Sequence, residues 1–394
     1  MNETDIRIEH IKVRDLVPFA ERVISTSVEG QFVPITMQRA LAHANNPYSA
    51  KDDVALLVAI DSDEEVVGYF GILPLLLREG KNYHKVHWFT TWNVSAKVRG
   101  RGIGGALMAE ALSLKHDFLI VGSVHARRVC REYGFWERDP LIYYWLDPAG
   151  MTQLNPIVWM RRGFRKLLRL FHIRKNIEIN SPAAKTLANA VAPITRNIFS
   201  PRLARIEAEL SKGFQFQEVN TIHADPKIPP HRPEVELHRN VDVVNWMLNY
   251  PWVVESGLSV TESLNYYFSD TRRLYKQIAV EVYDTSDHYL GFAVFSASQQ
   301  GEKTVLKTRD FRFEQPSYER AVLALALHYG REFNAETIEL PAEAARYIPG
   351  KLHKVLLQPK ERIYQCMPKS DDSPLALLWQ EISFHLWDGD MAFS

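Results

Sequence analysis

The stretch VRGRGIGGAL, residues 98–107, constrains the fold of this chain more than any other segment. It holds four glycines and two arginines, and an apolar run follows it. Glycine permits positive φ and lets a ligand approach the backbone closely. Gly102 and Gly104 leave no side chain above the amides that open the next helix, and such amides bind anions together with the helix dipole. The sequence therefore predicts a phosphate or pyrophosphate site between a strand and a helix.

The surroundings of this glycine loop, residues 98–105, select among phosphate-binding classes. The loop lacks the GKS or GKT sequence of a nucleoside triphosphate P-loop. The strand before it is not the first of a βαβ unit, and no ribose-binding acid is placed after it, which argues against a dinucleotide fold. The loop therefore points to another kind of phosphate-bearing ligand.

The order of elements around the loop indicates an α/β domain with a mostly antiparallel front half. Alternating or buried apolar runs predict strands at 4–14, 53–60, 66–72, 86–94, 118–121 and 142–146. Helical patterning predicts helices at 15–45, interrupted by Pro18 and Pro34, and at 105–114 and 125–132.

The second half of the chain repeats this order. Strands are expected at 278–283, 290–297, 304–313 and 337–340, with helices at 319–333 and 342–348. The segment VVGYFGI (66–72) resembles YLGFAVF (289–295), and each follows an acidic turn. We therefore expect an α/β (α+β) fold with two similar mixed-sheet domains, at 1–150 and 215–394, joined by a helical basic linker at 151–214.

Residues 156–176 of the linker interleave seven Arg and Lys side chains with apolar ones. Three interpretations fit this pattern. The segment is a linker helix packed on a neighbouring domain, a basic amphipathic helix in peripheral contact with an anionic membrane surface, or a site for an anionic ligand.

Composition narrows the class of protein further. The chain has 394 residues, with 47 Lys and Arg against 47 Asp and Glu, so no global basic charge points to nucleic acid. Only two cysteines are present, far apart, which rules out a disulfide framework or a CxxC metal pair and fits a reducing compartment. The acidic N-terminus lacks an apolar run, so we expect no signal peptide there, and no apolar run approaches membrane-spanning length. These features predict a cytoplasmic protein and leave its oligomeric state open.

The glycine loop and its flanks carry a family resemblance. The loop matches the motif Arg/Gln-x-x-Gly-x-Gly/Ala throughout, a strand ends in valine five residues before the motif arginine, and a later helix closes on Gly-Phe; the residues concerned are Arg99, Gly100, Arg101, Gly102, Ile103, Gly104, Val94, Gly134 and Phe135. On these residues the chain resembles the GNAT acetyltransferase superfamily, over about residues 4–147.

The resemblance implies a substrate and a reaction. Acetyl-CoA or another acyl-CoA would bind with its pyrophosphate on the loop amides, between Arg99 and Gly104, and its pantetheine along Asn93 and Val94. The Val94 amide would polarise the thioester carbonyl, and an amine or hydroxyl of a small-molecule or sugar-linked acceptor would attack it directly. No metal is implied. A catalytically inactive acyl-CoA-binding or scaffold protein is the alternative.

Several positions depart from the family pattern. Cys130 stands where many relatives have a tyrosine that protonates the CoA thiolate, so it is either that acid or a packed core residue. Ser123 replaces a common asparagine and would bond pantetheine with its hydroxyl. The strand at 86–94 has no carboxylate, which leaves His84, His87 or a water chain as the base.

Two further expectations concern the acceptor. Trp88 and Trp92 either line an acceptor pocket or pack in the core. In the second domain the matching loop, residues 313–318, contains no glycine, and Glu314 would repel a pyrophosphate. We therefore expect the second domain to lack CoA binding and to shape the acceptor cleft instead.

Overall fold

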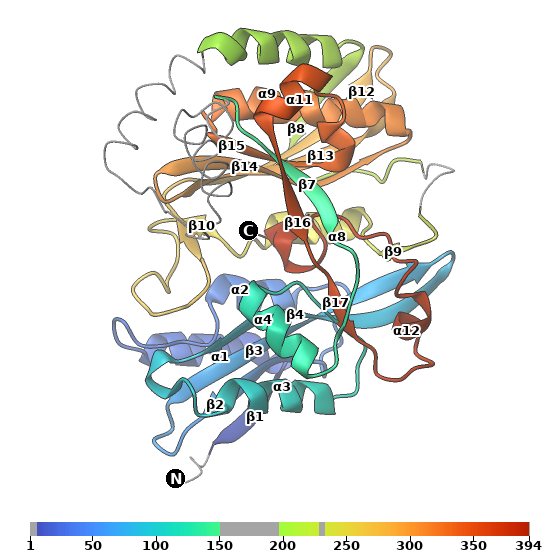
Figure 1. The fold of residues 1–394 in the computed structure, drawn as a ribbon. Helices are drawn as coiled ribbons and strands as arrows, with labels where there is room; N and C mark the ends of the chain where they lie inside the picture. Colours follow the sequence, from blue (N-terminus) through green and yellow to red (C-terminus); the bar gives the residue numbers. More distant parts are fainter. Residues whose placement is uncertain (1–5, 150–196, 228–232, 394) are drawn as a thin grey trace, which may run out of the picture. The chain divides into compact units, whose positions relative to one another are not determined.

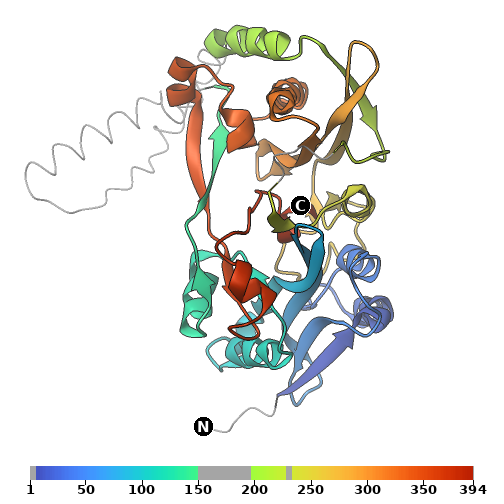
Figure 2. The same ribbon diagram turned by 90° about the vertical axis from the view of Figure 1, so that its right-hand side faces the viewer.

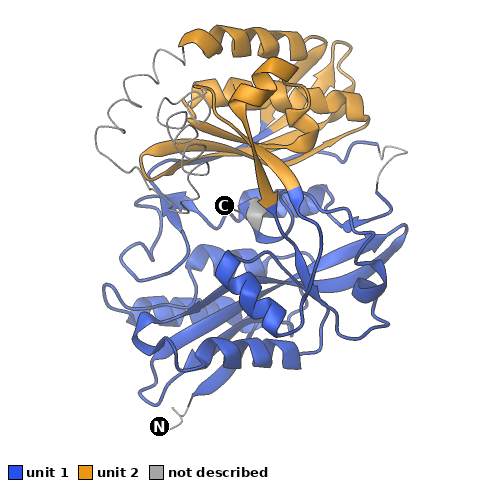
Figure 3. Ribbon diagram, in the orientation of Figure 1, with its two compact units in different colours: residues 1–141, 219–279, 362–394 blue, residues 142–218, 280–361 orange. Residues whose placement is uncertain are grey.

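The computed structural model describes residues 6–149, 197–227 and 233–393. Its chain divides into two compact units, shown in blue and orange in Figure 3. Unit 1 gathers residues 1–141, 219–279 and 362–394, and unit 2 gathers 142–218 and 280–361. The units are thus discontinuous in sequence, whereas the sequence predicts contiguous domains at 1–150 and 215–394. The basic segment 156–176 lies outside the described residues.

Unit 1 is built on a mixed sheet of eight strands. Their order is β1-β2-β3-β4-β5-β17-β6, and β9 pairs with the C-terminal end of β3. The strands are β1 (Arg7–Lys12), β2 (Val54–Ile60), β3 (Val66–Glu79), β4 (Asn82–Val94), β5 (Phe118–Ile120), β6 (Trp136–Glu137), β9 (Val235–Leu237) and β17 (Gln365–Met367). Only β4 and β5 run parallel among the neighbouring strands, which matches the mostly antiparallel front half that the sequence predicts.

Helices cover both faces of this sheet (Figures 1 and 2). Alternate side chains of β2 show why: Leu56 and Val58 pack with α1 (Val13–Thr26), while Leu57 and Ala59 pack with α3 (Ile103–Ser113). Successive residues of a strand point to opposite faces, so an apolar strand is buried on both sides. The helices α2 (Met37–Ala44) and α4 (Val124–Glu132) complete the two layers.

The strand β17 comes from the end of the chain and lies between β5 and β6. Cys366 pairs with Leu119 of β5 on one side and with Trp136 of β6 on the other. Unit 1 therefore needs residues beyond 361 to complete its sheet. The local pattern of β17 does not reveal this partnership, because only three residues form the strand.

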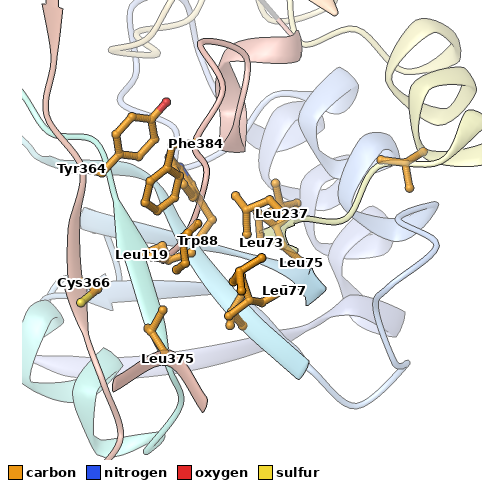
Figure 4. Close-up of a cluster of buried hydrophobic side chains, with 14 of the residues drawn as sticks. Leu73, Leu75, Leu77, Trp88, Leu119, Leu237, Tyr364, Cys366, Leu375 and Phe384 are labelled. Atoms are coloured by element: carbon orange, nitrogen blue, oxygen red, sulfur yellow. The ribbon is translucent and has the colours of Figure 1, made fainter. Parts of the chain in front are cut away.

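The C-terminal segment after β17 packs over one face of the sheet. It contains α12 (Pro374–Leu378) and the 3-10 helix η3 (Gly389–Phe393), and α8 (Val241–Asn249) lies against η3. Figure 4 shows Trp88 of β4 among Leu119, Tyr364 and Phe384, all within this core. This packing buries Trp88 completely.

Unit 2 has a sheet of seven strands in the order β16-β7-β15-β14-β13-β12-β8. They are β7 (Leu141–Leu146), β8 (Phe214–Val219), β12 (Tyr275–Asp284), β13 (Tyr289–Gln300), β14 (Lys303–Phe313), β15 (Thr337–Pro341) and β16 (Leu357–Arg362). The helices α9 (Arg320–Glu332), α10 (Ala342–Ala345) and α11 (Gly350–Leu356) belong to it, as does the short helix η2 (Pro316–Glu319). A helix also spans residues 197–210.

The two sheets repeat one topology, as the sequence predicts. β3 and β4 are antiparallel and β4 and β5 parallel in unit 1, and β13 to β15 repeat this pattern in unit 2. Each sheet then adds an antiparallel strand from elsewhere in the chain: β17 beside β5, and β7 beside β15. The expected α/β fold class with two mixed-sheet units is confirmed. The strand expected at 142–146 forms, but it pairs in the second sheet.

The remaining short elements are η1 (Ala96–Val98), β10 (Val254–Glu255) and β11 (Thr271–Arg272). Among the described residues, no helix combines the length and the apolar character needed to cross a bilayer.

Candidate functional site

The glycine loop connects β4 to α3 in unit 1. Gly102 is the N-cap of α3 and has φ of +80°, a left-handed conformation that glycine adopts without strain. Gly100 also has positive φ, at +84°. No side chain caps the helix. The first amides of α3 are therefore left for a ligand or water, because the first turn of a helix has no internal acceptors for them.

The space above the loop is open. A Cβ added at Gly100 or Gly102 would have no atom within 4 Å. Arg99 and Arg101 flank these glycines, are exposed, and form no ion pair with any described residue. Two unpaired guanidinium groups beside a helix N-terminus attract an anion. The phosphate site that the sequence places here stays a prediction, with which this geometry is compatible.

The end of β4 leaves a free edge beside the loop. β4 and β5 pair only at His87 with Phe118 and at Trp88 with Leu119. Beyond this point β4 continues to Val94 and keeps only β3 as a partner, with Asn93 opposite Tyr69. Asn93 and Val94 are both half-buried. The structure thus brings these two residues next to the loop, on an edge that can accept the amides of an extended ligand.

A register shift in β4 reorients the side chains near this edge. Phe70 pairs with Trp92 and Ile72 with Phe89, so β4 holds two residues, Thr90 and Thr91, where β3 holds only Gly71. Glycine is needed at 71, because a Cβ there would lie 2.2 Å from the Thr90 hydroxyl. A bulge of this kind turns the strand and redirects its side chains.

Trp88 and Trp92 lie in different parts of unit 1. Trp92 packs with the α3 layer, 3.5 Å from the position of a Cβ at Gly104, and is half-buried. Trp88 belongs to the core beneath the C-terminal segment. Only Trp92 therefore lies beside the glycine loop.

Ser123 caps α4 rather than standing free. Its hydroxyl oxygen accepts a hydrogen bond from the Ala126 amide at 3.3 Å, and the residue is exposed. The hydroxyl hydrogen remains available, so the cap is compatible with donation to a pantetheine oxygen.

Cys130 is fully buried on α4 in the core that packs α3 and α4 on the sheet. Burial raises the pKa of its thiol to about 12. An ordinary thiol has a pKa of about 8.5, so Cys130 would give its proton to a CoA thiolate only uphill. These surroundings favour the packing interpretation, and the donor role stays a prediction.

The two candidate histidines differ in accessibility. His87 is 4% exposed and stacks on His116 with ring centroids 4.0 Å apart. In the described part of the chain, neither of its ring nitrogens has a hydrogen-bond partner. Burial, with the nearby His116, lowers the pKa of His87 to about 3. His84 is half-buried and contacts Glu79 at 2.9 Å. Neither lies at the end of β4 where the thioester is expected, and His87 as base stays a prediction.

A polar cluster that the sequence does not indicate lies on the other face of the sheet in unit 1. We call it the Arg39 cluster; it comprises Arg39, Tyr69, Trp88, Trp252, Tyr266 and Asp390. Its members come from five distant parts of the chain, and residues 252–390 carry no local motif for them. Tyr69 joins it to the predicted site, since Asn93 is both its strand partner and its polar neighbour.

The equivalent loop of unit 2 is built differently. η2 occupies residues 316–319, and Glu319 pairs with Arg346 at 2.9 Å. Glu314 contacts His288 at 3.2 Å. Acidic side chains stand where the first unit has exposed arginines. The absence of CoA binding in this half stays a prediction, supported by this reversal of charge.

Comparison with known proteins bears on unit 1. Residues 27–135 match the model of the acetyltransferase (GNAT) family. This range includes the glycine loop, α3, β5 and α4. No curated protein matches the chain. The similarity to the GNAT family is therefore confined to residues 27–135 of unit 1.

Three solved structures with similar folds are described as GNAT proteins or as an N-myristoyltransferase. A tandem GNAT protein from the clavulanic acid biosynthesis pathway has 11% identity and a TM-score of 0.46, over 94% of this chain and 100% of that one. The N-myristoyltransferase of Saccharomyces cerevisiae, bound to myristoyl-CoA, has 10% identity and a TM-score of 0.45, over 92% and 82%. A GCN5-related N-acetyltransferase of Anabaena variabilis has 12% identity and a TM-score of 0.42, over 92% and 73%. At these TM-scores the likenesses carry no argument about function.

The family of the matched domain defines a class of chemistry. GNAT proteins use acyl-CoA as a substrate, and the matched domain supports acyl-CoA-dependent acyl transfer as the general activity. The acyl group, the acceptor and the catalytic residues are finer questions.

Proposed function

We propose that unit 1 binds acetyl-CoA or another acyl-CoA and transfers its acyl group to an amine or hydroxyl of a small-molecule or sugar-linked acceptor. The observation that carries this proposal is the open N-terminus of α3, where two left-handed glycines, Gly100 and Gly102, alternate with two arginines that form no ion pair with a described residue. In this proposal the α3 amides, with Arg99 and Arg101, hold the pyrophosphate. The free edge at Asn93 and Val94 holds the pantetheine amides.

The reaction would proceed by direct attack on the thioester carbonyl. The Val94 amide stabilises the oxyanion, and positioning of the two substrates supplies most of the acceleration. The departing thiolate takes its proton from Cys130 or from water. Because Cys130 is buried with a raised pKa, water is the donor that these surroundings favour.

The test is thiol release from acetyl-CoA by the full chain, monitored with a thiol reagent while acceptors are screened. Gly102→Asp should abolish both acyl-CoA binding and turnover, because its carboxylate would occupy the anion site. Gly30→Asp is the matched control, since Gly30 also has positive φ and open space around it. Equal acetyl-CoA affinity in Gly102→Asp and the parent chain would refute the site.

An inactive acyl-CoA-binding or scaffold protein is the second candidate function. It is favoured by the burial of both predicted catalytic side chains, Cys130 and His87. The two proposals differ in one outcome: the scaffold binds acyl-CoA with the same site but releases no thiol with any acceptor. Cytoplasmic location and membrane contact through residues 156–176 are further proposals. Binding of the full chain to vesicles with and without anionic lipid tests the second of these.

A further inference from the structure

We propose that the Arg39 cluster is the acceptor site of unit 1, that it takes an amine or hydroxyl on an oxygen-rich ring of the amino-sugar class, and that Asp390 accepts the proton of the attacking group. This inference rests on the proposed acyl transfer. It assigns the acceptor side of the same site, which neither the family match nor the glycine loop defines.

The cluster is contiguous. The Arg39 guanidinium lies 4.2 Å from the ring centroid of Trp252 and 5.3 Å from that of Tyr266. Tyr266 stacks on Tyr69, with ring centroids 5.8 Å apart. Asp390 is close enough to Tyr266 to raise the pKa of its hydroxyl by charge repulsion, although burial is the larger cause.

Tyr69 places this cluster at the reacting end of β4. It is the register partner of Asn93, and the Asn93 side chain is a polar neighbour of its hydroxyl. Asn93 belongs to the free edge proposed to hold the acyl-CoA. Thr91, redirected by the bulge in β4, lies beside Tyr266 on the same face. The cluster therefore lies on the face of the sheet opposite α3, beside the expected thioester.

The cluster combines buried donors that face polar groups with donors that face none. The Trp88 indole N–H faces Asp390, and the hydroxyls of Tyr69 and Tyr266 face Asn93 and Thr91. Arg39 Nε and Trp252 Nε1, on side chains at least nine-tenths buried, have no hydrogen-bond partner among the described residues. Each such group costs about 1–3 kcal/mol when left unsatisfied. A ligand with several lone-pair oxygens would satisfy them together.

Asp390 is the acidic member of this donor-rich group. It lies deep in unit 1 and is partly buried. The indole N–H of Trp88, Arg39 of α2 and Arg362 of β16 are its neighbours. Burial raises the pKa of Asp390, and the two arginines oppose that rise. A carboxylate with a raised pKa is a stronger base than an ordinary one.

The chain positions Asp390 through a specific contact. The preceding Gly389 has φ of +75°, and a Cβ there would lie 2.0 Å from the Trp88 ring. Glycine thus lets η3 approach β4 closely. The segment is also held by Arg362, which donates to the Asp388 carbonyl oxygen at 3.1 Å, and by the Trp252 amide, which donates to the Phe393 carbonyl oxygen at 3.1 Å. These bonds hold the backbone on both sides of Asp390 in unit 1.

The proposed step is balanced within the two substrates. The acceptor nitrogen attacks the thioester carbonyl carbon, a C–N bond forms, and the C–S bond breaks with its electron pair leaving on sulfur. Asp390 takes the N–H proton, and that proton returns through solvent to the thiolate. The products are an amide and free CoA. A hydroxyl acceptor gives an ester by the same route.

The experiment measures thiol release by the full chain from acetyl-CoA with glucosamine, galactosamine or mannosamine, and with cyclohexylamine as a ring amine that lacks hydroxyls. We expect at least one amino sugar to react with kcat/KM tenfold or more above that of cyclohexylamine. Asp390→Asn should lower kcat by about 10²–10⁴-fold with acetyl-CoA affinity unchanged. Asp63→Asn, at an exposed turn, is the matched control and should keep full activity.

The possible results distinguish a failure of this inference from a failure of the proposed function. Loss of acetyl-CoA binding in the parent chain would overturn the proposed function itself. Normal acetyl-CoA binding with no amino sugar reacting, or with cyclohexylamine reacting as well, would overturn the acceptor class. Full kcat and an unchanged pH profile in Asp390→Asn would overturn the role of Asp390. Rescue by Asp390→Glu, with thermal unfolding like the parent's, would support a proton-accepting role rather than a structural one.

Discussion

Gly102 offers the sharpest test of the loop, because its two roles can be measured separately. Its φ of +80° should make Gly102→Ala cost about 1–2 kcal/mol of unfolding free energy from backbone strain alone. No atom lies within 4 Å of the added Cβ, so no steric cost adds to this figure. In a unit of this size the loss corresponds to a fall in Tm of about 2–4 °C for each kcal/mol.

Ligand binding should respond far more strongly than stability. The added methyl group would occupy the space in which we place the pyrophosphate, so acetyl-CoA affinity should fall at least tenfold, or about 1.4 kcal/mol. Gly30→Ala is the matched control, because Gly30 has φ of +75° and equally open surroundings. It should lose similar stability and no affinity.

The assay combines thermal unfolding without ligand and calorimetric titration with acetyl-CoA, for the parent and both variants. The expected pattern is two similar decreases in Tm and a single loss of affinity. Equal affinity in the two variants would show that the ligand does not approach Gly102, and the reasoning from open space and helix dipole would fail.

Three further predictions follow from the core of unit 1. Cys130→Ala should cost about 1 kcal/mol of stability and leave kcat unchanged, whereas a fall in kcat at constant acetyl-CoA affinity would restore the thiol as proton donor. His43 and His87 are buried and neutral, with pKa values lowered to about 3, so stability should fall as pH drops from about 6.5 toward 3. For each histidine, the unfolding free energy should fall by at most about 1.4 kcal/mol per pH unit. If the unfolding free energy of His87→Gln depends on pH as steeply as that of the parent, this prediction is wrong. Deleting residues 362–394 removes β17, so the product should lack a cooperative unfolding transition for unit 1; a preserved transition would be the opposite result.

Local sequence patterns predicted the parts of the fold that depend on local chemistry. The helices expected at 105–114 and 125–132 form as α3 and α4, and the β2 strand follows from its apolar run. The glycine loop was predictable because backbone conformation, helix dipole and charge all act within a few residues. The repeat of strand order was equally visible in the spacing of apolar segments.

The parts that escaped prediction depend on contacts between distant residues. β17 has three residues and owes its place to pairing with β5 and β6, which no local pattern records. The Arg39 cluster joins residues from positions 39 to 390, and its aromatic members read as ordinary core side chains.

The stoichiometry of acyl-CoA binding to the full chain tests the central claim most directly. Equilibrium dialysis with labelled acetyl-CoA should give one bound molecule per chain, lost in Gly102→Asp and kept in Glu314→Gln. Two molecules per chain, or one molecule that survives Gly102→Asp, would contradict the assignment of the site to the glycine loop of unit 1.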